Sequence, residues 1–132
     1  MKKEHDYLIC IDSDGCAMDT MNSKHFYCFG PEWVKQYGLE DIKEEALKYW
    51  NQINLYSKTR GINRFKGLAM GLEWAKEKGY ETEGQEEFVA WTKEAPELSN
   101  PALLAQCQKK KNPCMEPVSY THLRAHETLM NI

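Results

Sequence analysis

The sequence predicts an α/β protein in which a single N-terminal strand is followed by helices. Residues 7–11 form a short apolar run that stops at a polar loop, as a buried strand does. Beyond residue 20, apolar residues instead recur every three or four positions, which is the helical period, and no second strand pattern follows. A lone buried strand cannot satisfy its own backbone donors and acceptors. We therefore expect its partner strands to lie outside this chain and most of the chain to be helical.

The expected strand leads into the loop Asp12-Ser13-Asp14-Gly15, where we expect the chemistry. Side chains two positions apart on an extended chain point to the same side, so both carboxylates can reach one pocket. An ionised aspartate can attack phosphorus once Mg²⁺, which prefers oxygen ligands, offsets the phosphate charge. Repulsion from the first carboxylate favours a proton on the second, which can then serve the leaving group. Gly15 lets the backbone approach the phosphate.

Five helices are expected in the rest of the chain, over residues 22–38, 42–54, 64–78, 85–95 and 99–111. The dipeptide Gly30-Pro31 is expected to break or kink the first helix, and Asp41 to cap the second. Gly79 is expected to end the third, and Ser99 to cap the fifth.

Two glycines, Gly67 and Gly71, share one face of the third expected helix, where they would normally weaken it. We expect them to permit close packing against a neighbouring helix; the alternative is a backbone approach to a ligand. The tryptophans are expected in the helical core, at Trp33, Trp50, Trp74 and Trp91.

The bulk properties favour a small-molecule partner. The chain of 132 residues is long enough for one domain with a core, and its net charge of −3 gives no basic field for nucleic acid. The N-terminal apolar run is too short for a signal peptide or a membrane span. Five cysteines without a CxxC pair predict free thiols in a reducing cytoplasm.

Residues 8–20, Leu-Ile-Cys-Ile-Asp-Ser-Asp-Gly-Cys-Ala-Met-Asp-Thr, resemble the first motif of the haloacid dehalogenase-like hydrolases. In that motif apolar residues precede Asp-x-Asp-Gly-Thr, and a further Asp-Thr or Asp-Ser follows. Cys16 departs from it, because threonine is usual there. The resemblance implies a Rossmann-like core with an inserted helical cap. Residues 1–20 would carry the first strand and catalytic loop, and residues 21–116 an incomplete cap.

The same resemblance implies the roles of the two aspartates. Asp12 would be the nucleophile that forms an aspartyl-phosphate, and Asp14 the general acid and base. Both would be ligands of Mg²⁺, and the substrate would be a small phosphorylated metabolite. No later strand ending in Ser or Thr, no phosphate-holding lysine and no distal acidic pair can be identified. We therefore expect this chain alone not to turn over substrate.

The aspartate loop has three other interpretations. A phosphotransferase or mutase would use the same Asp12 and differ only in the acceptor of the phosphoryl group. A non-catalytic helical interaction module would use the aspartates merely to form a turn. A calcium loop is excluded, because counting from Asp12 puts Ala17 where glycine is needed and Ser23 where glutamate is needed.

Arg60 and Arg64, in the basic segment before the third helix, are with Gly15 the expected phosphate-binding residues. The forked guanidinium suits phosphate oxygens, although a solvated cationic face is the alternative. His25 is expected to be a satisfied, partly buried histidine in preference to a residue that lines the entrance of the cap.

Residues 118–128 resemble the in-frame translation of a sequencing adapter. Residues 117–132 are therefore expected to be a read-through tail that is not native to the protein. His122 and His126, four positions apart, are accordingly rejected as a metal pair. We expect the protein's own sequence to be cut off near Glu116, which would account for the missing strands.

Overall fold

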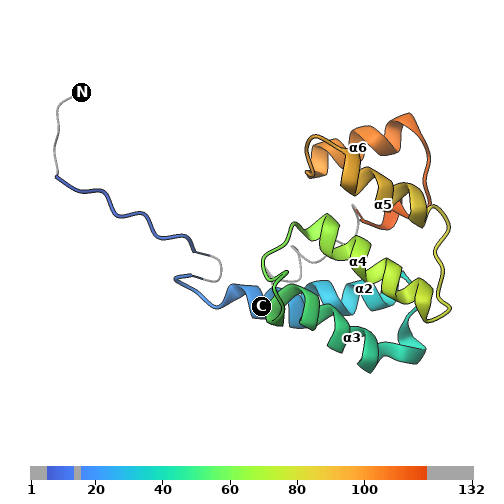
Figure 1. Cartoon of the computed structure of the whole chain (residues 1–132), viewed down its shortest axis with the longest axis horizontal. Helices are drawn as coiled ribbons and strands as arrows, with labels where there is room; N and C mark the ends of the chain where they lie inside the picture. The colour runs from blue at the N-terminus through green and yellow to red at the C-terminus, as the bar shows by residue number, and fades with distance from the viewer. Residues whose placement is uncertain (1–5, 14–15, 119–132) are drawn as a thin grey trace.

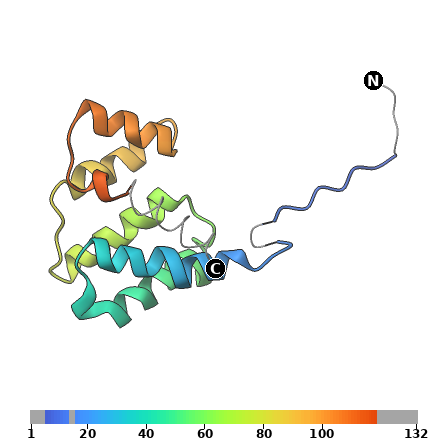
Figure 2. The same cartoon turned by 180° about the vertical axis from the view of Figure 1, so that it is seen from behind.

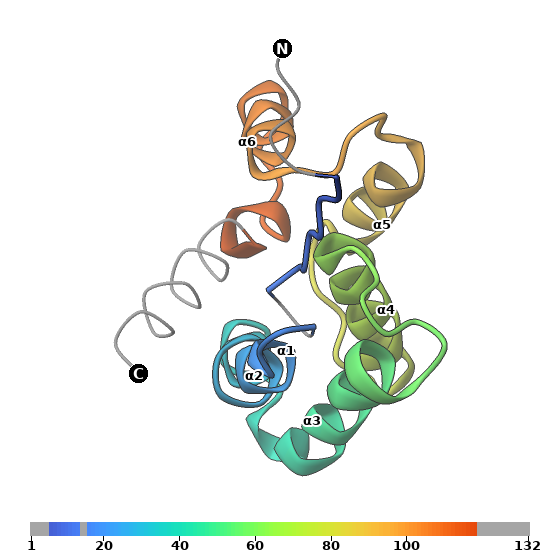
Figure 3. The same cartoon turned by 90° about the vertical axis from the view of Figure 1, so that its left-hand side faces the viewer.

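The computed structural model of the chain describes residues 6–13 and 16–118, and these residues form helices and no strand. Two π-helical turns (η1 and η3) and one 3₁₀ turn (η2) adjoin the α-helices. The elements are α1 (Thr20–Lys24), η1 (His25–Phe29), α2 (Gly30–Gln36), η2 (Glu40–Ile42), α3 (Lys43–Asn51), η3 (Gln52–Tyr56), α4 (Arg64–Glu77), α5 (Gln85–Glu94) and α6 (Asn100–Lys109). Figure 3, which looks along α2, shows α3 to α6 following one another in chain order around the body.

The predicted α/β class is wrong for the part of the chain that the structure describes. Residues 7–12 are extended but unpaired, and they run away from the helical body (Figures 1 and 2). Their large apolar side chains are 73–89% exposed, at Tyr7, Leu8, Ile9 and Ile11. The physical reason is that an apolar run makes a segment suited to a sheet but does not provide the neighbouring strand with which the segment must pair. Without a second strand there is no ladder of hydrogen bonds to join.

The helix expected over residues 22–38 forms, but Gly30-Pro31 does not break it. α1, η1 and α2 follow one another directly, and Pro31 lies in the first turn of α2. A wider turn, η1, precedes the proline. A π-helical turn accommodates a lost backbone hydrogen bond inside a longer helix, so the chain continues past the proline.

The second expected helix also forms, as α3 and η3, but its predicted cap is wrong. Ile42 occupies the N-cap position of α3, and no side chain caps this end. Asp41 lies instead in the 3₁₀ turn η2, which leads directly into α3. The tighter turn displaces the aspartate from the position at which it could accept from the first free N–H groups.

The last three predicted helices are confirmed as α4, α5 and α6, within one or two residues at each end. The Ser99 cap is confirmed, because its Oγ accepts from the Ala102 N–H at 3.3 Å. Gly79 follows the end of α4 with a φ of 92°, a left-handed conformation that glycine adopts without strain. Asn63 caps the start of α4, accepting from the Phe65 N–H at 2.9 Å.

The glycine pair in α4 confirms the predicted close packing of helices. A Cβ at Gly71 would lie 3.1 Å from Cζ2 of the fully buried Trp33, and one at Gly67 would lie 2.8 Å from Oδ1 of Asn54. The Trp33 and Trp50 rings stack with their centroids 5.0 Å apart. The absence of a side chain at Gly67 and at Gly71 therefore lets α4 approach η3 and α2.

The tryptophans lie in or against the core, as predicted. Trp33 and Trp50 are buried, and Trp74 and Trp91 are half-buried against the core. Val118, the first residue of the stretch that resembles an adapter, is fully buried in the same core. Residues 119–132 lie outside the described part of the chain, and so do the two rejected histidines.

Candidate functional site

The loop that carries Asp12 precedes α1 and exposes the Asp12 side chain to solvent. Its ends are joined by two backbone hydrogen bonds, from Ala17 N–H to the Asp12 carbonyl (3.1 Å) and from Met18 N–H to the Ser13 carbonyl (2.9 Å). The Asp12 carboxylate accepts from the Ser13 N–H at 2.9 Å. The loop thus doubles back on itself and holds an accessible carboxylate at the entrance to the helical body.

Two of the predicted site residues, Asp14 and Gly15, lie outside the described residues. Within residues 6–13 and 16–118, no cluster of three or more His, Cys, Asp or Glu side chains could hold a metal ion. Asp12 alone offers one hard oxygen ligand of the kind that Mg²⁺ accepts, which is too few to define a site. The described residues therefore do not form the predicted magnesium site by themselves.

Arg60 and Arg64 are held by different parts of the helical body. The Arg60 Nη1 donates to the Leu55 carbonyl at 2.9 Å, at the end of η3. The Arg64 Nη2 donates to Oδ1 of Asn100 at 2.7 Å, and burial lowers the pKa of Arg64. In the described part of the chain, neither arginine makes a hydrogen bond or ion pair with Asp12. The structure thus does not bring the arginines and Asp12 together.

A buried polar link joins the two π-helical turns. The Trp50 Nε1–H donates to Nδ1 of His25 in η1 at 3.1 Å, and the Asn54 amide in η3 donates to the Trp50 carbonyl at 2.9 Å. Burial, followed by the charges of Arg60 and Lys24, lowers the pKa of His25 to about 4. The prediction of a satisfied histidine is confirmed, and this side chain is neutral at physiological pH.

The link between the π-helical turns was missed by sequence reasoning. η1 and η3 lie inside apolar patterns that fit an ordinary helix, so the spacing gave no signal for the wider turns. A signal did exist for Asn54, since a glycine such as Gly67 inside a helix indicates that something approaches it closely.

Comparison with known proteins adds no relative: no family model, no curated protein and no solved structure matches this chain. Within the described residues, no helix combines the length and apolar character needed to cross a bilayer. The residues themselves are therefore the only basis for inferring the function.

Proposed function

We propose that this chain carries the nucleophile and helical cap of a Mg²⁺-dependent cytoplasmic phosphohydrolase that acts on a small phosphorylated metabolite. Asp12 attacks phosphorus and forms an aspartyl-phosphate, which water then hydrolyses. The observation that supports this most is the accessible Asp12 carboxylate, on a doubled-back loop that opens directly into a helical body. The motif over residues 8–20 adds the same assignment by resemblance.

Each residue of the proposed site has one role. Asp12 keeps its carboxylate exposed, so a phosphate can approach it without displacing a neighbouring side chain. Asp14 protonates the leaving group, and Gly15 leaves room for phosphate oxygens beside the backbone. Magnesium, when bound, would offset the charge of the phosphate. Because the described residues supply only one of its ligands, we propose that this chain alone does not turn over substrate.

The test is a phosphatase assay with para-nitrophenyl phosphate and Mg²⁺, on this chain and on the full reading frame of the source DNA. We expect activity in a chain that supplies the remaining Mg²⁺ ligands, and there Asp12→Asn should lower kcat by at least about 100-fold. Asp41→Asn, an exposed aspartate in η2, serves as the matched control and should retain full activity. Full activity in Asp12→Asn would remove Asp12 as the nucleophile.

A non-catalytic helical interaction module is the second candidate, and one observation favours it. The helices bury a continuous core without any contribution from residues 7–13, all of which are exposed. This candidate predicts cooperative calorimetric unfolding of the present chain at a midpoint that Mg²⁺ and inorganic phosphate do not change. A midpoint that rises with both ligands in the wild-type chain, but not in Asp12→Asn, would instead favour the phosphohydrolase.

A further inference from the structure

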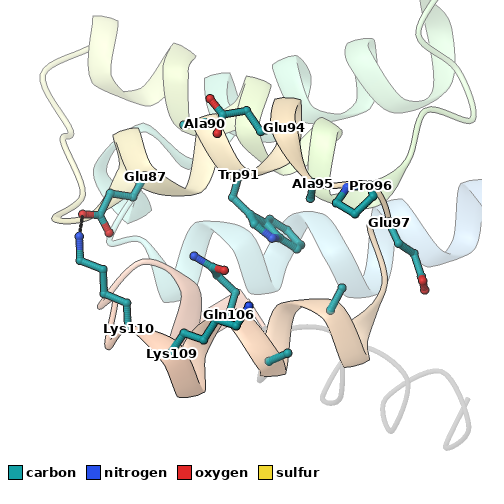
Figure 4. Close-up of a pocket in the computed structure, with 12 residues that line it drawn as sticks. Glu87, Ala90, Trp91, Glu94, Ala95, Pro96, Glu97, Gln106, Lys109 and Lys110 are labelled. Atoms are coloured by element: carbon teal, nitrogen blue, oxygen red, sulfur yellow. Dashed lines mark hydrogen bonds and ion pairs between the residues drawn. The ribbon is translucent and has the colours of Figure 1, made fainter.

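A groove of about 650 Å³ separates α5 from α6, at the end of the helical body remote from the Asp12 loop (Figures 1 and 4). Five of the twelve lining residues are small and apolar, among them Ala90 from α5 and Ala102 and Ala105 from α6. This volume is in the range of pockets that hold small organic molecules. The groove is bounded at one end by Pro96 in the connecting loop.

Trp91 is the aromatic centre of this groove. Its indole is half-buried and extends between the two helices, and Gln106 of α6 reaches toward α5 beside it (Figure 4). The ring is held from behind by Phe65, whose ring meets it edge-on with centroids 5.6 Å apart, and by Phe88 at 6.0 Å. A ring fixed in this way offers a preformed surface against which another flat ring can stack.

The charged side chains around the groove differ in whether they are free to contact a ligand. Glu87 is engaged by Lys110 and by the Asn112 amide, which donates to Glu87 Oε2 at 2.9 Å. The Glu94 and Glu97 side chains point away from Trp91 (Figure 4). Lys109 lines the groove, and its ammonium makes no ion pair or side-chain hydrogen bond with any described residue. Three glutamates and two lysines line the groove. Because Glu87 is paired with Lys110 and the other two glutamates point away from Trp91, Lys109 is the cation available to a ligand.

We propose that this groove binds a flat aromatic anion. The ring of the ligand stacks on Trp91 between the alanine walls, its anionic group meets the Lys109 Nζ, and the Gln106 amide donates a second hydrogen bond. Stacking supplies the apolar contact, and the lysine selects for negative charge. The groove does not include Asp12, so the inference is independent of the proposed phosphohydrolase.

The test is a heteronuclear NMR titration of the full chain with 2-naphthoate as the probe. We expect saturable shifts confined to α5 and α6, including the Trp91 indole N–H. Lys109→Gln should raise Kd by about threefold to fivefold, the usual effect of one exposed charge. Lys111→Gln is the matched control, because Lys111 is an exposed neighbour that does not line the groove, and it should leave Kd unchanged.

Two further measurements make the test decisive. Ala105→Leu should weaken binding by filling the groove at an exposed position, without touching the packing of Trp91 on the core. The cation 2-naphthylmethylammonium should bind more weakly than 2-naphthoate. Shifts that do not saturate, shifts spread over the other helices, equal effects of the two lysine variants, or tighter binding of the cation would each overturn the proposal.

Discussion

Trp50 fixes His25 in its neutral form, because the indole N–H points at Nδ1 of the imidazole over 3.1 Å. A donor aimed at this nitrogen requires it to be unprotonated. The rings lie 6.0 Å apart by their centroids, inside the contact between η1 and α3. Protonation would set two N–H groups against each other and add a cation near Arg60 and Lys24, whose charges already lower the pKa of His25.

This relationship predicts a loss of stability in mild acid. The pKa of His25 falls from 6.5 to about 4 on folding, so between these values the unfolded chain binds more protons than the folded one. The stabilisation is complete above pH 6.5 and is lost as the pH falls toward 4, by at most about 1.4 kcal/mol per pH unit. Urea unfolding of the wild-type chain and of His25→Gln at pH 7, 5.5 and 4.5 measures this loss. The carboxylates contribute equally in both proteins, so their effect cancels in the difference between the two free energies of unfolding. The same dependence of the free energy of unfolding on pH in both proteins would refute the prediction.

Gly71→Ala is predicted to destabilise the chain, although alanine favours helices. The new methyl group would lie 3.1 Å from Trp33, which is fully buried and stacked on Trp50, so neither ring can move aside easily. Overpacking costs about 1–3 kcal/mol and the helix propensity returns about 1, so we expect a net loss of about 1 kcal/mol. Chemical denaturation measures the loss. Lys66→Ala, on the exposed face of the same helix, should change stability by less than about 0.5 kcal/mol.

The helices were predictable from sequence because their signals are local. The apolar period and the turn residues that bound α4, α5 and α6 all lie within a few positions of one another. The strand over residues 7–11 was predicted wrongly because an apolar pattern reports what a segment could bury, whereas a strand depends on a distant partner. The candidate site could not be predicted in full for the same reason, because contacts between residues far apart in the sequence leave no local signal. Nothing near Arg64 in the sequence indicates its hydrogen bond to Asn100, 36 residues away, so this contact could not be predicted, and the phosphate-binding role of Arg64 stays a prediction.

The thiols are predicted to fall into two groups of reactivity. Cys10 and Cys16 are exposed, whereas Cys114 is fully buried and burial raises its pKa to about 12. Burial also raises the pKa of Cys28 and Cys107. Because the thiolate is the nucleophile, dithionitrobenzoate at pH 8 should release a fast phase of two thiols, with Cys114 at least about 100-fold slower. The double variant Cys10→Ser, Cys16→Ser should abolish the fast phase. A fast phase that persists in this variant would contradict the assignment of the fast thiols to Cys10 and Cys16.

Asn112 is predicted to be the polar side chain whose loss most weakens the attachment of the segment after α6. It is 2% exposed, its amide donates to the Gly84 carbonyl at 3.1 Å and to Glu87, and its Oδ1 accepts from the Cys114 N–H at 2.8 Å. Asn112→Ala removes the partner of the buried Cys114 N–H and of the half-buried Gly84 carbonyl, so we expect a loss of about 2–3 kcal/mol in the free energy of unfolding. Lys110→Gln removes only the exposed ion pair with Glu87 and should cost less than about 1 kcal/mol. Equal losses in the two variants, measured by urea unfolding at pH 7, would show that the buried amide is not the anchor of this segment.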